Sequence, residues 1–422
     1  MNKTHVHSDL LDETCVIARH ESGLQILICE KPEYSSSFAI FGTRYGSIDT
    51  TFSRDGSELH TVPTGIAHFL EHKLFESEDG DAFSKYAKTG ASANAYTSFD
   101  RTCYLFGCSD NFDTNLDILL NFVRSPYFTA ETVKKEQGII GQEIRMYDDS
   151  ADWRVMFNLL SVLYHNHPVK IDIAGTIDSI AKIDDKLLYE CYNTFYNPSN
   201  MFLCIAGNVN SDEILEKVQN TIGDVKKVEI TRSNFDEPQS IVKNYTEQKM
   251  SVAMPLFCVG IKDKIDTPQR SPHEIAVSQV LSEILSSDSS SLYKKLLDKG
   301  LINKDFGGEY FYGYGYSAFI FQGESKNPQA VIDEFKEEIT RIKNFGISNE
   351  MFNCAKNSLY GRSVRRFNNV EDVVSVLVDS AMNLCGPFDA SEELSRVTVE
   401  DIVKRMTNID MENISLSVIL PM

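Results

Sequence analysis

Long hydrophobic runs are missing from this chain of 422 residues. No stretch approaches 18 uninterrupted apolar residues, the length that a membrane-spanning helix needs. Residues 1–12 are polar and lack the apolar core of a secretory signal peptide. We therefore expect no membrane segment, and the cytoplasm is the simplest location.

Paired cysteine motifs are also missing. The nine cysteines are odd in number, scattered, and never spaced as C-x-x-C, which argues against a disulfide framework. Most lie in apolar runs, as Cys204 does, where a reduced thiol behaves as a small hydrophobic side chain. These features agree with a reducing compartment.

Basic residues are too few to balance the acidic ones. The chain has 41 Lys and Arg against 61 Asp and Glu, a formal net charge of −20. Nucleic acid and anionic membrane surfaces are therefore excluded as expected partners, whereas a basic peptide or subunit would be attracted. The alternative is that the charge only keeps the surface soluble.

Histidine is scarce, with 9 residues, yet two of them share a short stretch with a glutamate: residues 65–76 read GIAHFLEHKLFE. In a helix, His68 and His72 lie on one face and Glu71 lies beside them. Two imidazole nitrogens can bind zinc, and the carboxylate can handle the proton of a water molecule held there. The pattern H-x-x-E-H thus predicts a catalytic metal site. Two partly exposed helix histidines are the alternative.

A third metal ligand is expected from a later helix. Residues 129–147 have a helical pattern in which Glu136 and Glu143 are seven positions apart and share a face. Two histidines leave a catalytic zinc site one protein ligand short, and a carboxylate commonly supplies it. Glu143 is our candidate, although on its own it would be read as a solvated helix residue.

Small and β-favouring residues alternate after the motif helix, at Asn94, Ala95, Tyr96 and Thr97. We expect an edge strand with an accessible backbone, paired with a strand at residues 101–107. Such an edge could bind an extended peptide as an additional strand. An edge strand without a ligand is equally compatible with the local sequence.

The order of elements predicts an α+β fold made of two homologous domains. Strands at 15–18, 24–29 and 37–42 are expected to form an antiparallel meander. We place the first domain at residues 1–225, a polar, strand-poor linker at 226–248, and the second domain at 249–422.

The second half repeats the order of the first: strand, helix, two strands, paired helices and a closing strand. It has no H-x-x-E-H, so we expect the repeat to serve as a wall or substrate platform. The predicted elements are strands at 251–261, 306–311, 316–322 and 414–420, and helices across 271–299, 328–345 and 349–384.

These features resemble the insulinase, or pitrilysin and mitochondrial processing peptidase, family of zinc metallopeptidases, over nearly the whole chain. In that family, H-x-x-E-H is followed roughly 70 to 80 residues later by E-x6-E. Glu136 and Glu143 match E-x6-E, and Glu143 lies 71 residues beyond His72. The chain looks most like bacterial, cytosolic two-domain members that are encoded beside a relative lacking the motif.

The resemblance implies one Zn²⁺ ion bound by His68, His72 and Glu143, with Glu71 as the general base. Glu136 would orient a ligand from behind. It also implies that each domain is an antiparallel-rich sheet with helices on one face, and that the domains close like a clamshell around a chamber.

The family's N-A-[FY]-T strand, along which the substrate backbone pairs, matches Asn94, Ala95, Tyr96 and Thr97. The implied function is hydrolysis of short or unfolded peptides bound in extended form. The alternative is a catalytically quiet scaffold subunit, against which the intact general base argues.

One family feature is missing. Active members or their partner subunits often carry an Arg and a Tyr in a pattern like L-x-x-x-L-R-x-x-x-G-L-x-Y, whereas here Leu297 stands at the Arg position and no Tyr follows Leu301 as expected. We therefore expect a heterodimer with a related subunit that supplies the pair, or else a homodimer. Substitutes within this chain would be Tyr310, Tyr312, Tyr314, Tyr316, Arg362, Arg365 or Arg366.

Overall fold

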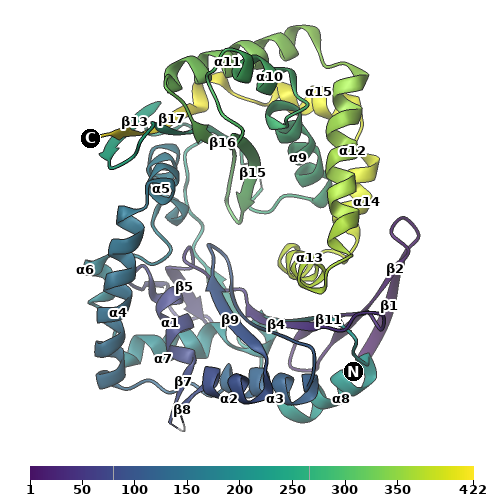
Figure 1. Ribbon diagram of the computed structural model, residues 1–422. Helices are drawn as coiled ribbons and strands as arrows, with labels where there is room; N and C mark the ends of the chain where they lie inside the picture. The colour runs from purple at the N-terminus through teal and green to yellow at the C-terminus, as the bar shows by residue number, and fades with distance from the viewer. Residues whose placement is uncertain (79, 266) are drawn as a thin grey trace. The chain divides into compact units, whose positions relative to one another are not determined.

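The computed structural model describes residues 1–78, 80–265 and 267–422, and their packing forms two compact units (Figure 1). Each unit is discontinuous in sequence. Unit 1 comprises Met1–Ile144, Asp172–Ser233 and Val364–Asp389; unit 2 comprises Arg145–Ile171, Asn234–Ser363 and Ala390–Met422.

Unit 1 is organised around a seven-stranded sheet in the order β1-β2-β3-β11-β4-β10-β9. Small sheets, β12-β5-β6 and β7-β8, accompany it. The strands are β1 (Asn2–Ser8), β2 (Glu13–Arg19), β3 (Gln25–Glu30), β4 (Ser37–Thr43), β5 (Thr51–Arg54), β6 (His60–Thr61), β7 (Glu76–Ser77), β8 (Gly80–Asp81), β9 (Ser92–Thr97), β10 (Thr102–Cys108), β11 (Met201–Gly207) and β12 (Ile230–Arg232).

The predicted meander is only partly correct. β2 and β3 pair antiparallel, but β11 lies between β3 and β4, parallel to β3 and antiparallel to β4. β11 is apolar and buried at every position, which suits a central strand covered on both faces. The meander prediction failed because local sequence does not encode this long-range insertion.

The helices of unit 1 include the two that carry the candidate metal ligands, α1 and α4. They are α1 (Ile66–Leu74), α2 (Ala82–Thr89), α3 (Phe112–Phe122), α4 (Ala130–Asp149), α6 (Ile177–Ile180), α7 (Asp185–Phe195), the 3₁₀ turn η2 (Pro198–Asn200), α8 (Ser211–Ile222) and α13 (Val370–Asn383). The chain passes from unit 1 to unit 2 within α4.

Unit 2 repeats this plan with a sheet ordered β13-β17-β14-β16-β15. The order and strand directions match β3-β11-β4-β10-β9, including the parallel pair at the same place, so the expected repetition is present. Its elements are α5 (Ala151–Leu163), η1 (Pro168–Lys170), β13 (Tyr245–Met250), β14 (Leu256–Lys262), α9 (Pro272–Ser286), α10 (Ser291–Asp298), β15 (Gly307–Gly313), β16 (Tyr316–Glu324), α11 (Pro328–Phe345), α12 (Asn349–Arg366), α14 (Asp389–Arg396), α15 (Val399–Thr407), η3 (Met411–Asn413) and β17 (Ile414–Pro421).

Helices cover both faces of each sheet, which corrects the expectation of one covered face. In β10, Tyr104 packs against Phe122 of α3, whereas the neighbouring Cys103 belongs to the core beneath α13. In β14, Val259 faces the core shared with α9 and α11, whereas a Cβ on Gly260 would meet side chains of α5. Alternate strand residues point to opposite faces, so both faces are buried.

The second covering helix of each unit comes from the other half of the sequence. α5 packs on β14 and β17 in unit 2, and α13 packs on β11 and β4 in unit 1. The segment expected as a linker, 226–248, also contains β12, which pairs with β5, and the start of β13.

All nine cysteines are free thiols. Within the described ranges, no helix has both the length and the apolar character needed to cross a bilayer.

Candidate metal centre

The start of α1 is fixed by close backbone packing against the loop before α6. Gly65 has a φ of 86°, and a Cβ there would lie 2.4 Å from the carbonyl oxygen of Ala174. Gly175 faces Thr64 in the same way, since its Cβ would lie 2.6 Å from the Thr64 oxygen. The Ser179 hydroxyl donates a hydrogen bond of 2.8 Å to that oxygen. Only glycine fits these positions without a shift of the backbone.

α1 and α4 bring His68, His72 and Glu143 together. One ligand atom from each can be chosen so that all three lie within 4.8 Å of one another. His72 Nε2 is 3.3 Å from Glu143 Oε2, and His68 Nε2 is 3.7 Å from Glu143 Oε1. Ligand atoms about 2.0–2.1 Å from a tetrahedral zinc ion are roughly 3.3 Å apart, so this donor set fits zinc.

Glu136 supports the group from behind His72. Its Oε1 is 2.9 Å from His72 Nδ1, and its side chain is 7% exposed. A carboxylate on one ring nitrogen leaves the other nitrogen for a metal, an arrangement typical of histidine ligands in zinc proteins. Burial lowers the pKa of His72, but the hydrogen bonds with Glu136 and Glu143 outweigh it and raise the pKa to about 10.

His68 differs from His72 in its surroundings. Burial, and then the neighbouring His72, lower the pKa of His68 to about 4, which keeps its imidazole neutral. A neutral imidazole is the form that binds a metal. Its Nδ1 is buried and has no hydrogen-bond partner among the residues described.

Glu71 lies between the histidines in sequence and is held by Thr97. The Thr97 hydroxyl donates a 2.6 Å hydrogen bond to Glu71 Oε2. Burial raises the pKa of Glu71, and the Thr97 hydrogen bond partly opposes this. The contact between Thr97 and Glu71 was not predicted from the sequence. The signal for it was that Thr97 ends the predicted edge strand, which is separated from the motif helix by a single helix, α2.

The predicted edge strand is confirmed, because β9 is the last strand of the seven-stranded sheet and, among the described residues, pairs with β10 alone. It also packs against α1 (Figure 1). Asn94 and Tyr96 are exposed, and Ala95 is partly buried. The Ala95 amide donates to the side-chain oxygen of Asn94 at 2.9 Å, so a peptide that pairs there would replace this local bond.

The residues considered as substitutes for the missing Arg and Tyr belong largely to other interactions. The Tyr310 hydroxyl donates to Asp263 at 2.8 Å, Arg362 pairs with Glu283, and Arg366 lies 3.6 Å from Asp379. Leu297, at the expected Arg position, is 38% exposed on α10. Tyr310 and Arg362 are therefore already used in the packing of unit 2.

Two family profiles match the sequence. The one described as Insulinase (Peptidase family M16) matches residues 58–177, which include the motif and Glu143. The one described as Peptidase M16 inactive domain matches residues 182–359.

Curated relatives span most of the chain. The uncharacterized zinc protease YmfH of Bacillus subtilis is 39% identical over 404 residues, 94% of each chain. The beta subunit of the mitochondrial-processing peptidase of Saccharomyces cerevisiae is 24% identical over 402 residues, 86% of this chain and 84% of that protein.

Solved structures share the fold. A crystal structure described as an M16-like peptidase from Alicyclobacillus acidocaldarius has a TM-score of 0.93 and 33% identity, and covers 97% of this chain and 98% of that chain. A protease from Helicobacter pylori has a TM-score of 0.83 at 20% identity, which is a likeness of fold alone.

Proposed function

This chain belongs to the insulinase family, peptidase family M16, and is therefore a zinc protease; from that premise we propose that it hydrolyses peptide bonds of short or unfolded peptides. The observation that carries this proposal is the grouping of His68, His72 and Glu143 beside Glu71, a partly buried glutamate held by a residue of the edge strand. The alternative, a catalytically quiet scaffold, has no use for Glu71 in that position.

His68, His72 and Glu143 would hold one zinc ion, and Glu136 would fix the ring of His72. Zinc bound there supplies a Lewis acid that polarises the scissile carbonyl and acidifies water.

Glu71 accepts a proton from the attacking water and delivers it to the leaving amine. Its burial favours this role, because a raised pKa makes a carboxylate a stronger base. Thr97 holds the carboxylate at one oxygen and leaves the other for the water. Thr97 therefore orients the carboxylate, and Glu71 transfers the proton.

The substrate pairs with β9 in extended form, with its backbone along Asn94, Ala95 and Tyr96. The free side of an edge strand offers amide and carbonyl groups at a regular spacing, which selects for an extended peptide over a folded one. A folded protein would first have to release a segment, so short or unfolded peptides are preferred.

The domain arrangement is part of the proposal. We place one repeat at residues 1–225 and the other at 249–422, joined through 226–248, with residues 145–171 and 364–389 each packed in the unit of the other repeat. We infer that the two repeats close around a chamber. The nine cysteines are free thiols, and thiols stay reduced in a reducing compartment, which supports a cytoplasmic location.

A related subunit is proposed to complete the active site. Leu297 offers no positive charge where family members often have Arg, and a developing oxyanion needs hydrogen-bond donors or charge. A heterodimer would supply the Arg and Tyr from the partner; a homodimer is the second choice. The name of the yeast relative, a subunit of a processing peptidase, agrees with a two-chain enzyme.

The test is cleavage of a quenched-fluorescence peptide library by the purified chain, alone and mixed with its candidate partner. We expect activity that a chelator removes and stoichiometric zinc restores, and that the partner increases. Zinc binding without cleavage in either mixture would refute the peptidase proposal. Full activity of the monomer would refute the partner proposal alone.

A further inference from the structure

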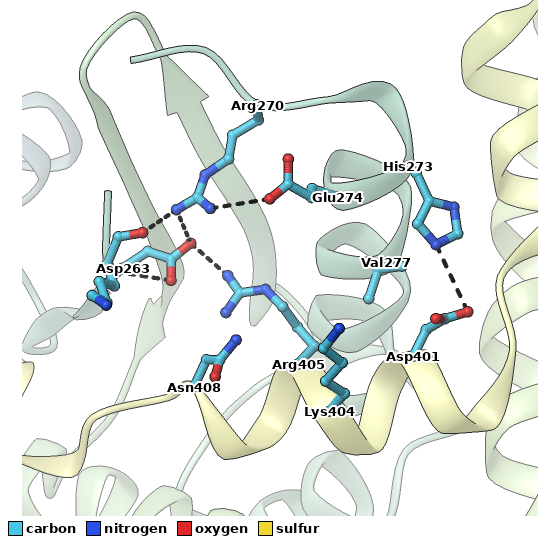
Figure 2. A pocket seen from close by; sticks show the side chains of 10 residues that line it. Asp263, Arg270, His273, Glu274, Val277, Asp401, Lys404, Arg405 and Asn408 are labelled. Carbon is cyan, nitrogen blue, oxygen red and sulfur yellow. Dashed lines mark hydrogen bonds and ion pairs between the residues drawn. The ribbon is translucent and has the colours of Figure 1, made fainter. Parts of the chain in front are cut away.

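A cavity of about 240 Å³ lies in unit 2, between the start of α9, the helix α15 and the loop after β14 (Figure 2). All of its lining belongs to unit 2, whereas the candidate metal centre belongs to unit 1. The side chains that line it are those of Asp263, Lys264, Arg270, His273, Glu274, Val277, Asp401, Lys404, Arg405 and Asn408.

Two arginines at this cavity are nearly buried and converge on one carboxylate, as Figure 2 shows. The side chains of Arg270, Arg405 and Asp263 are 13%, 11% and 3% exposed. Arg270 Nη2 is 3.0 Å from Asp263 Oδ2, and Arg405 Nη2 donates to the same oxygen. That oxygen also accepts from Tyr310 and Ser317. Glu274 Oε1 forms a second, longer ion pair with Arg270 Nη1, so Asp263 is the carboxylate that both guanidinium groups share.

The other two carboxylates of the lining serve the starts of helices. Glu274 Oε2 accepts from the Ser271 amide and hydroxyl at 2.9 and 2.8 Å, in the capping box of α9. Asp401 Oδ2 accepts from the Thr398 amide and hydroxyl at 2.9 and 2.7 Å, in the capping box of α15. Both carboxylates therefore already interact with helix amides.

Hydrogen-bond donors remain available at the cavity. Arg405 Nε donates a 2.9 Å hydrogen bond to the Ser278 hydroxyl, and its Nη2 donates to Asp263. Arg405 Nη1 has no hydrogen-bond partner within the part of the chain that the structure describes. Arg270 Nη1 has only a long contact of 3.7 Å, to Glu274. Lys404 is exposed and makes no ion pair with any described residue. Both arginines line the cavity, so these nitrogens can reach a ligand bound in it.

The lining carries four Lys or Arg against three Asp or Glu, a formal balance of +1 in a chain of net charge −20. We propose that this cavity binds the phosphate group of a small molecule. Arg270, Arg405 and Lys404 contact its oxygens. Guanidinium forks match phosphate geometry, and three donor groups suit its three peripheral oxygens better than the two of a carboxylate.

The size of the cavity favours an organic phosphate over the free ion. Its volume of about 240 Å³ leaves space beside a bound phosphate group. Val277 lines the same space and offers an apolar contact to the remainder of the ligand. The ligand is therefore a small phosphomonoester.

The test uses isothermal titration calorimetry on the full-length, zinc-loaded protein at constant ionic strength. The probes are inorganic phosphate, glycerol 3-phosphate, acetate and chloride. We expect glycerol 3-phosphate to bind more tightly than phosphate, and acetate to bind no better than chloride. Equal affinity for phosphate and glycerol 3-phosphate would assign the site to the free ion and overturn the organic ligand. Acetate binding as tightly as phosphate would overturn the phosphate site.

Variants locate the binding. Lys404→Gln removes the charge of an exposed residue that makes no ion pair with any described residue. It should weaken the binding of glycerol 3-phosphate roughly tenfold, as the loss of one charged hydrogen bond does. Arg270→Lys keeps a positive charge near Asp263 but removes Nη1, and should also weaken binding. Lys336→Gln, an equal loss of charge on an exposed residue outside the cavity, is the control. Unchanged affinity in both cavity variants would overturn the proposal. The calorimetric test does not measure peptide cleavage, so its result is independent of the proposed peptidase activity.

Discussion

Glu136 offers a quantitative test of how the metal centre is supported. Glu136→Gln keeps the shape and one acceptor oxygen but removes the negative charge. In the structure, Glu136 Oε1 is 2.9 Å from His72 Nδ1. Glu136 is 5% exposed, so water cannot readily take the place of its carboxylate beside His72. We therefore expect the variant to orient His72 but to bind zinc more weakly.

The magnitude follows from the contact. Removing the partner of a histidine ligand typically costs about 10–100-fold in metal affinity, or about 1.4–2.7 kcal/mol. Gln can still accept from Nδ1, so Glu136→Gln should fall near tenfold. Glu136→Ala leaves His72 Nδ1 without this partner, and the loss of affinity should approach 100-fold.

The assay is competition for zinc between the metal-free protein and a chromophoric chelator at fixed pH. Glu131→Gln is the matched control, because Glu131 is exposed in the first turn of the same helix, α4. Wild-type affinity in Glu136→Ala would refute the supporting role. Complete loss of zinc in Glu136→Gln would instead make Glu136 a ligand.

Three further predictions concern other parts of the molecule. Thr97→Val removes the donor to Glu71 and should lower kcat roughly tenfold with little change in KM, whereas Thr97→Ser should retain activity; equal rates in both would show that the contact is idle. Gly65→Ala should lower the melting temperature more than Gly90→Ala, because both residues have positive φ but only at Gly65 does a Cβ meet a carbonyl oxygen at 2.4 Å; equal losses would contradict the packing argument. Glu237 accepts hydrogen bonds from three backbone amides and Lys262, which outweigh burial and lower its pKa below 4.5, so its stabilising effect is present above that pH and is lost as the pH falls further. In urea denaturation, Glu237→Gln should be less stable at pH 7 and lose less stability on acidification, and parallel pH profiles would rule this out.

The sequence predicted what depends on local spacing. The helix with His68 and His72, the later Glu143 and the edge strand β9 all lie where their patterns indicated. Helical spacing places side chains four apart on one face regardless of the remaining fold. Most elements of the second half were also predicted, because each has its own periodicity, but β13, α14 and α15 were missed and the helix expected at 349–384 is divided into α12 and α13.

Long-range packing was not predictable in the same way. The insertion of β11 between β3 and β4, and the covering of each sheet by α5 or α13 from the other half, depend on contacts between distant residues. An apolar run such as that of β11 predicts burial on both faces but does not name the covering helix. The hydrogen bond from Thr97 to Glu71 likewise depends on how β9 meets α1.

Peptide cleavage by Glu71→Gln tests the central claim most directly. Gln is nearly isosteric with Glu and can still accept from Thr97, but it cannot take a proton from water. We predict that the variant binds one equivalent of zinc, as wild type does, and cleaves the peptide library about 10²–10⁴-fold more slowly. Zinc-loaded Glu71→Gln that cleaves within a few-fold of the wild-type rate would contradict the account.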